Sequence, residues 1–183
     1  MSFELPPYPY DLLDPYRRIA AQHSGGVVDL SVGTPCDPPP IQAVHALAES
    51  DSERGYPPSV GSEEFRESCR KWVKRRFDVD LKIENNIAAC IGTKEFVVST
   101  PHFLRLRNPE KDTVLYPEVS YPSYAMGAEL SGCRAVPVRI DDDGQLLLQE
   151  LEQSDINRAL MLWVNYPSNP TGAVGDLESI ANW

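Results

Sequence analysis

Residues that could bind an anion lie together in one short segment, Gly92 to Glu95, which follows an apolar run and opens a helical pattern. The backbone N–H groups in the first turn of a helix lack intrahelical partners and attract negative charge. With the hydroxyl of Thr93 and the ammonium group of Lys94 beside them, such a turn suits a phosphate dianion. We therefore predict a phosphate site formed by Gly92, Thr93 and Lys94, although an ordinary helix N-terminus could have the same sequence.

Four other residues could contact a ligand. Gly33 follows a strand-like run and would let the backbone approach a ligand closely, or form a plain turn. Tyr121 could stack on a planar ligand or pack in the core. Tyr56 precedes Gly61 and, taken alone, would be a surface tyrosine. Asn169 begins an Asn-Pro-Thr-Gly turn after an apolar run, and its amide could hydrogen-bond a ligand.

The hydrophobic pattern predicts the elements that would position these residues. Strands are expected at residues 87–92, 113–116, 134–140 and 159–165, and helices at residues 94–106, 121–130 and 146–153. This alternation is typical of a mostly parallel sheet covered on both faces, an α/β fold. Pro101 is expected to kink or shorten the first helix, because proline has no N–H and clashes one turn back.

The section before residue 87 has fewer signals. Residues 27–32 are strand-like, and Ser62 is expected to cap a helix with acidic residues in its first turn and basic residues in its last. One stripe of this helix is expected to pack on the core, and it consists of Phe65, Cys69, Trp72, Val73 and Phe77.

Composition argues against several classes of partner. A formal net charge of −10 leaves no extended basic surface, so no nucleic acid is expected. No apolar run approaches the ~20 residues of a membrane span. The first sixteen residues contain four prolines and no Lys or Arg, which argues against a targeting peptide and predicts a cytoplasmic protein. The four cysteines and three histidines are widely spaced, so no metal site is expected.

The ordered set of segments resembles the class I and II aminotransferases of fold type I, over essentially the whole chain. The set consists of Gly33-Thr34-Pro35, Tyr56 ahead of Gly61, Gly92-Thr93-Lys94-Glu95, Tyr121-Pro122-Ser123-Tyr124 and Asn169-Pro170-Thr171-Gly172. The resemblance implies the N-terminal part of the pyridoxal-phosphate-dependent transferase fold, which is three-layered (α/β/α) and here incomplete. Residues 1–50 would form the N-terminal arm and part of the small domain, and residues 51–183 the first portion of the large coenzyme-binding domain.

The same resemblance implies a strand order and a coenzyme site. Residues 113–116 would lie between residues 134–140 and 159–165, and residues 87–92 would pair with none of these three. Gly92, Thr93 and Lys94 would bind the phosphate of pyridoxal 5'-phosphate. Tyr121 would stack on its pyridine ring, and the amide of Asn169 would hydrogen-bond its phenolic oxygen.

Two further roles follow from the resemblance. Gly33 would lie near the α-carboxylate of the substrate, and Tyr56 would reach the coenzyme phosphate of the partner subunit in a homodimer. Val119 stands where many relatives have proline, so the loop is expected to follow a different path while Tyr121 keeps its place.

The resemblance also implies ping-pong transfer of an amino group between an amino acid and a 2-oxo acid. Lys94 cannot readily bind the coenzyme phosphate and also react with the coenzyme aldehyde, because the aldehyde lies on the far side of the pyridine ring from the phosphate. In the order of the family's motifs, the lysine that forms the Schiff base comes after these segments, so the resemblance places it beyond Trp183, and the chain alone is expected to be inactive.

Within the family, the closest resemblance is to the bacterial succinyldiaminopimelate aminotransferases of lysine biosynthesis. The segments that carry it are Leu5 to Asp11, Val28 to Pro35 and Ile91 to Glu95. Donor and acceptor would be glutamate and N-succinyl-2-amino-6-oxopimelate. An aspartate or aromatic aminotransferase remains an alternative, as does, from another class, a non-catalytic regulator domain that binds the coenzyme as a ligand.

Overall fold

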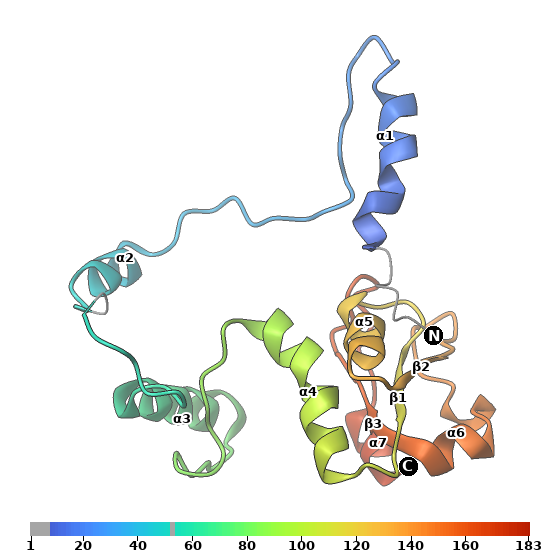
Figure 1. The fold of residues 1–183 in the computed structure, drawn as a ribbon. Coiled ribbons are helices and arrows are strands. Elements are labelled where there is room, and N and C mark those ends of the chain that lie inside the picture. The colour runs from blue at the N-terminus through green and yellow to red at the C-terminus, as the bar shows by residue number, and fades with distance from the viewer. Residues whose placement is uncertain (1–7, 52–53) are drawn as a thin grey trace. The chain divides into compact units, whose positions relative to one another are not determined.

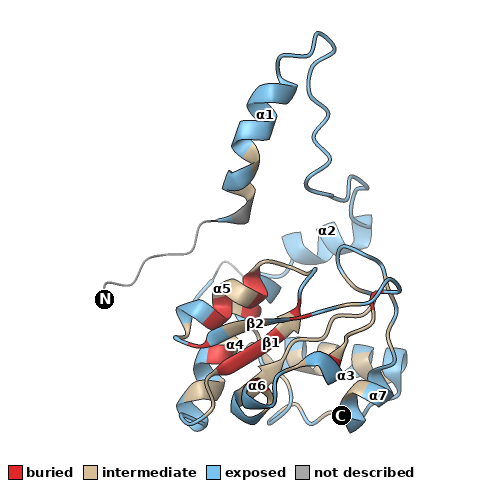
Figure 2. Cartoon of the chain, turned by 90° about the vertical axis from the view of Figure 1, so that its right-hand side faces the viewer, coloured by how far each residue is buried: buried red, intermediate tan, exposed pale blue. Residues whose placement is uncertain are grey.

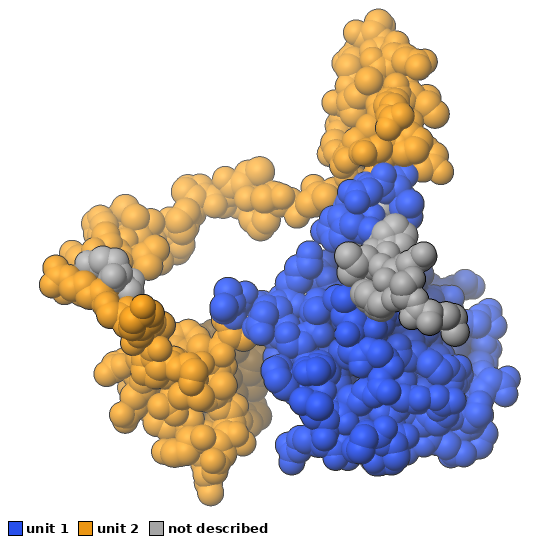
Figure 3. Space-filling view, in the orientation of Figure 1, with its two compact units in different colours: residues 1–12, 91–183 blue, residues 13–90 orange. Residues whose placement is uncertain are grey.

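The computed structural model describes residues 8–51 and 54–183. Part of the opening segment, Leu5 to Pro7, lies outside the described residues. The chain forms two compact units, each treated by itself: unit 1 comprises Met1–Leu12 and Ile91–Trp183, and unit 2 comprises Leu13–Cys90 (Figure 3). The domain boundary expected at residue 50 stays a prediction.

Unit 1 contains a parallel three-stranded sheet of order β2-β1-β3 (Figure 1). The strands are β1 (Thr113–Pro117), β2 (Arg134–Val138) and β3 (Ala159–Leu162). Thr113 lies opposite Arg134 on one side and Ala159 on the other, so the strands begin together. The expected place of β1 between the two other strands is confirmed.

Helices cover both faces of this sheet. Neighbouring residues of a strand point to opposite faces, so Val114 packs with Ala128 of α5 (Ser123–Leu130), and Leu115 packs with Leu148 on the other side. The helix α4 (Thr93–Arg107) packs against α5 and β3, and the Leu115 face is covered by η2 (Leu148–Glu150) and α7 (Leu177–Asn182). The three-layer α/β/α arrangement is therefore present, with the buried residues concentrated in β1 and α5 (Figure 2).

Ion pairs join the amino ends of the strands. The guanidinium group of Arg158 donates to both carboxylate oxygens of Asp112, with 2.8 Å from Nε to Oδ1. Arg134 donates to Asp155 of α6 (Gln153–Arg158) at 2.6 Å. The backbone N–H of Arg134 also donates to the carbonyl of Asp112. Hydrogen bonding from Arg158 lowers the pKa of Asp112, so this carboxylate stays charged in the folded chain.

The crossing of α4 and α5 depends on Gly127. A Cβ at this position would lie 2.9 Å from Val98 Cα and 3.2 Å from the carbonyl oxygens of Val97 and Val98. The two helices therefore touch backbone to backbone. The expected shortening of α4 at Pro101 is not found, since the helix continues through Pro101 to Arg107. Pro101 and Val97 are buried, and this packing compensates for the missing N–H.

Three predicted elements are wrong. Residues 27–32 and 87–92 are not strands, because a strand needs a neighbour and among the described residues none pairs with either segment along its length. Ala89 makes a single backbone hydrogen bond, to the carbonyl of Val60. The helix expected at residues 146–153 is interrupted, since Leu151 and Glu152 have extended backbones that separate η2 from α6.

Three helices of unit 2 follow a short connecting helix, η1 (Pro9–Leu13): α1 (Asp14–Ala20), α2 (Ile41–Ala48) and α3 (Glu63–Phe77). The predicted cap of α3 is confirmed, because the hydroxyl of Ser62 accepts from the N–H of Phe65 at 3.2 Å. The predicted burial of its apolar stripe is not found. Phe65 and Trp72 are about half exposed, because no other described helix of unit 2 packs extensively against α3.

Candidate functional site

The N-terminus of α4 has features that favour a bound anion. Gly92 has φ +92°, a conformation that residues with a Cβ rarely adopt, and it turns the chain from an extended segment into the helix. The N-cap residue Gly92 makes no side-chain capping bond, and the N–H groups at the start of a helix have no partner within the helix. The carboxylate of Glu95 accepts from the N–H of Ile91 at 3.3 Å and from the hydroxyl of Ser99 at 3.5 Å.

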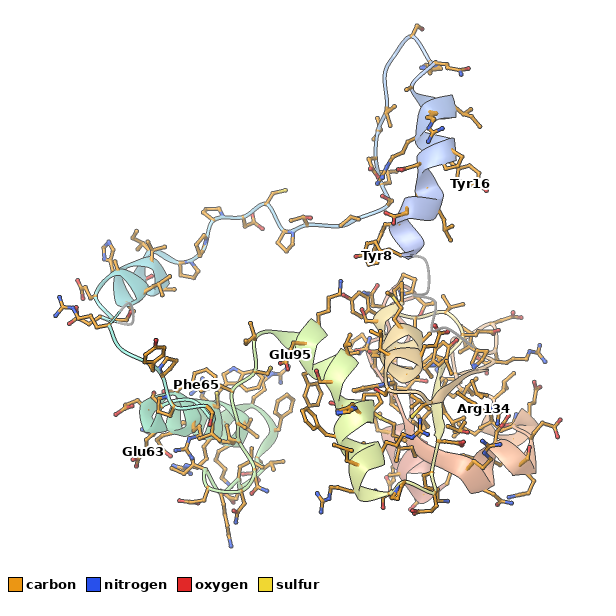
Figure 4. The ribbon with its side chains drawn as sticks, viewed as in Figure 1. Tyr8, Tyr16, Glu63, Phe65, Glu95 and Arg134 are labelled. Carbon is orange, nitrogen blue, oxygen red and sulfur yellow. The ribbon has the colours of Figure 1, made fainter. Side chains whose placement is uncertain are left out.

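Lys94 adds a positive charge to this turn. Its Nζ lies 3.5 Å from the hydroxyl of Tyr8 and 5.1 Å from the centre of the Tyr8 ring. Among the described residues, no carboxylate forms an ion pair with Lys94. Within the described part of the chain, the ammonium group contacts the hydroxyl and the ring face of Tyr8, which leaves it without an anionic partner there. The start of α4 can be found in Figure 4 by the label of Glu95, the residue after Lys94, and Tyr8 is labelled in the same view.

Tyr121 lies in the loop between β1 and α5, and hydrogen bonds hold that loop in place. The N–H of Glu118 donates to the carbonyl of Val138 at 2.8 Å, and its carboxylate accepts from the N–H of Ile140 at 2.9 Å. The hydroxyl of Ser120 donates to the carbonyl of Pro117 at 2.6 Å. These bonds fix the loop without a proline at Val119, and Tyr121 is half-buried at its end.

A row of four aromatic rings connects the α4 turn with Tyr121. The Tyr121 ring meets Tyr124 edge to face at 6.2 Å, and Tyr124 stacks on Trp163 at 5.1 Å with 21° between the planes. Trp163 in turn meets Phe96, in the first turn of α4, edge to face at 6.1 Å. Burial raises the pKa of Tyr124 above its usual range, so this ring stays neutral.

Sequence reasoning missed this row of rings. Tyr121 and Tyr124 are three residues apart, which in the helix expected at residues 121–130 would place them about one turn from each other, and that spacing could have suggested a contact. Trp163 lies in an apolar run that the pattern predicts only as a buried strand. Its contact with Phe96 joins residues 67 positions apart in the chain (163 − 96 = 67), so it depends on the tertiary fold.

Asn169 lies in a turn after β3. The N–H of Gly172 donates to the carbonyl of Ser168 at 2.7 Å, and the N–H of Ser168 donates to the carbonyl of Ala173 at 2.8 Å. The peptide bonds before Pro167 and Pro170 are cis. This compact turn leaves the side chain of Asn169 exposed, so its amide is accessible to a ligand.

The structure therefore places five of the seven predicted residues in unit 1: Gly92, Thr93, Lys94, Tyr121 and Asn169. Tyr121 and Asn169 follow the carboxyl ends of β1 and β3, which is where ligands bind in parallel α/β sheets. The contact of Phe96 with Trp163 places the start of α4 at the same edge.

Gly33 and Tyr56 belong to unit 2, and their roles stay predictions. A Cβ at Gly33 would meet nothing within 4 Å, and its φ is not in the left-handed region, so no described neighbour requires glycine there. The Tyr56 side chain is fully exposed. Neither residue has a packing role within its own unit.

Comparison with known proteins identifies the family. Residues 25–182 match the family model of the class I and II aminotransferases. The chain belongs to this family. Enzymes of the family use pyridoxal phosphate, and the site fits that coenzyme: a helix N-terminus with Lys94 for a phosphate, an aromatic ring at Tyr121 and an accessible amide at Asn169.

Three relatives indicate the breadth of the match. An LL-diaminopimelate aminotransferase from Aquifex aeolicus is 36% identical over 95% of this chain and 46% of its own length. A structure of a probable N-succinyldiaminopimelate aminotransferase from Thermus thermophilus is 32% identical, with a TM-score of 0.79 over 94% of this chain and 47% of that one. The aminotransferase AspB from Helicobacter pylori is 26% identical, with a TM-score of 0.84 over 100% of this chain and 48% of that one.

The chain spans a little less than half the length of each of these relatives. No helix among the described residues is long and apolar enough to cross a membrane.

Proposed function

We propose that this chain forms the N-terminal part of an aminotransferase that uses pyridoxal phosphate to move an amino group between glutamate and N-succinyl-2-amino-6-oxopimelate, in diaminopimelate and lysine biosynthesis. The observation that carries the proposal is the start of α4, where Gly92 opens the helix with a positive φ and Lys94 has no ionic partner among the described residues. Its counterpart in the family binds the coenzyme phosphate.

Each residue of the site has a separate task in this proposal. Bound pyridoxal phosphate supplies an electron sink that lets the Cα proton of an amino acid leave. Thr93 and Lys94 bind the phosphate and so fix one end of the coenzyme. Tyr121 stacks on the ring and fixes its plane, and Asn169 donates to the phenolic oxygen at the other end.

The site is completed across a homodimer in this proposal. Tyr56 reaches the coenzyme phosphate of the partner subunit, and its full exposure within this chain supports a contact outside its own unit. Gly33 lies near the α-carboxylate of the substrate, and the open space around it supports a close approach by a ligand.

Substitutions in the α4 turn test the coenzyme site in the protein at its full natural length. A hydrogen bond to a charged group contributes about 1.5–3 kcal/mol, so Lys94→Met should weaken binding of pyridoxal phosphate about 10- to 100-fold. Thr93→Val should weaken it about fivefold, the equivalent of one neutral hydrogen bond. The control is Lys71→Met, which removes an exposed lysine of α3 that pairs only weakly with Glu67 at 3.7 Å.

Equilibrium dialysis of the coenzyme against each purified variant measures these effects. The Lys71→Met variant should bind as the parent does. A Lys94→Met variant that also binds as the parent does would remove Lys94 from the site.

The substrate requires an activity measurement, because two relatives bear different names. With N-succinyl-2-amino-6-oxopimelate as acceptor, glutamate should be converted to 2-oxoglutarate. A second candidate reaction, with LL-diaminopimelate as donor and 2-oxoglutarate as acceptor, is favoured by the name of the Aquifex relative. Turnover of LL-diaminopimelate alone would replace the first reaction with the second, and turnover only of aspartate or aromatic amino acids would reject both.

A further inference from the structure

We infer that Trp163 is a positioning residue that sets the spacing between the phosphate-binding turn and the ring-stacking Tyr121. This inference rests on the proposed function, since it assumes that one ligand contacts both places. It concerns a residue that contacts neither end of the ligand itself and acts through the rings beside it.

The backbone fixes Trp163 where β3 ends. Its N–H donates to the carbonyl of Leu115 at 2.9 Å, which extends the pairing of β3 with β1 by one more bond. The side chain packs on the cluster formed by Val114 and Ala128. Trp163 is therefore attached to the most buried part of unit 1, which fixes the position of its ring.

From this position, the indole ring contacts both halves of the site. One contact is the stack with Tyr124, whose own ring meets Tyr121. The other contact is with Phe96, two residues after Lys94. The indole thus contacts one ring from the helix that presents the phosphate-binding turn and one from the helix that follows Tyr121.

Hydrogen bonding does not explain a tryptophan here. Its Nε1 is buried and has no hydrogen-bond partner among the described residues, and an unpaired buried donor is unfavourable. Because the indole N–H forms no hydrogen bond there, the contacts of the ring surface must account for a tryptophan at this position. Phenylalanine should supply much of that surface, whereas leucine should not.

A positioning residue has a characteristic effect on binding. A ligand that contacts two places gains affinity only when their spacing matches it, because the second contact then forms without further loss of freedom. A ligand that contacts one place is indifferent to the spacing. Pyridoxal phosphate is a ligand of the first kind, and inorganic phosphate is a ligand of the second kind.

The experiment compares these two ligands in the protein at its full natural length. Trp163→Leu should weaken pyridoxal phosphate about tenfold, the equivalent of losing both ring contacts. The inhibition constant of inorganic phosphate, measured in competition with the coenzyme, should change less than twofold. Trp163→Phe should stay within threefold of the parent for both ligands.

Two more variants guard against a general loss of structure. Phe96→Leu removes one ring contact at a side chain that is 51% exposed, so it leaves no large cavity and should give a smaller selective loss. Trp72→Leu is the control, because it makes the same substitution as Trp163→Leu at a tryptophan of the other unit. Trp72 lies in α3, is as exposed as Phe96 at 51%, and contacts Phe77 in unit 2. It should leave both ligands unchanged.

The outcomes separate the inference from the proposed function. A parent that binds no pyridoxal phosphate would overturn the proposed function. If the parent binds it and Trp163→Leu binds it equally well, the inference alone is wrong. Equal weakening of coenzyme and inorganic phosphate in both Trp163→Leu and Phe96→Leu would also overturn it, because that pattern is a loss of the fold and not of spacing.

Discussion

Replacing Gly127 with alanine has two opposite effects on stability: it raises the helix propensity of α5, and it crowds the close contact of α5 with α4. Alanine in a helix interior is favoured over glycine by about 1 kcal/mol. The new Cβ, however, would lie 2.9 Å from Val98 Cα, a backbone atom that cannot rotate away. Overpacking costs about 1–3 kcal/mol, and a contact with helical backbone belongs in the upper half of that range. The net effect should be a loss of about 1–2 kcal/mol.

Hydrogen exchange measured by mass spectrometry can localise this loss. In the protein at its full natural length, the amides of α5 should exchange about 5- to 30-fold faster in the Gly127→Ala variant, while those of α6 keep their rate. Gly33→Ala is the control, because the added methyl group meets nothing within 4 Å. Unchanged or slower exchange in α5 would show that propensity outweighs the contact, and the reasoning from backbone proximity would fail.

Two other substitutions test single interactions. Ser62→Ala removes the acceptor of the Phe65 N–H and should destabilise α3 by about 1 kcal/mol, seen as roughly fivefold faster exchange of its amides. The lowered pKa of Asp112 means that its pair with Arg158 stabilises the fold above the ordinary value of 3.8 and loses this contribution as pH falls through the lower folded value. Asp112→Asn should therefore melt earlier than the parent at pH 6, and the difference should shrink toward pH 3. A constant difference across that range would contradict the assignment.

Local signals predicted those parts of unit 1 whose partners lie within the chain. β1, β2 and β3 were located from short apolar runs, because each strand finds a neighbour in the same sheet. The start of α4 was located because glycine and the residues after it specify a helix N-terminus by themselves. The cap at Ser62 was found for the same reason, since a capping bond joins residues only three positions apart.

Elements that depend on distant partners were not predictable in this way. Residues 87–92 have a strand-like composition, yet backbone groups form a strand only when another strand accepts their hydrogen bonds. Pro101 lies inside α4 because burial in the tertiary fold outweighs a local penalty. The contacts of Trp163 with Tyr124 and Phe96 depend on how the layers pack, which no short pattern encodes.

The ion pairs and the candidate site lie at opposite ends of the sheet. Asp112 and Arg158 join the strands where they begin, while Tyr121 and Asn169 follow where strands end. Mutations that alter the residues around a substrate would therefore accumulate at one edge without loosening the interactions that hold the other. Such a separation lets residues around the candidate site change while the scaffold stays constant. Divergence among descendants of this chain is therefore expected first at exposed positions of the loops after β1 and β3, such as Val119, and not at Tyr121 or Asn169.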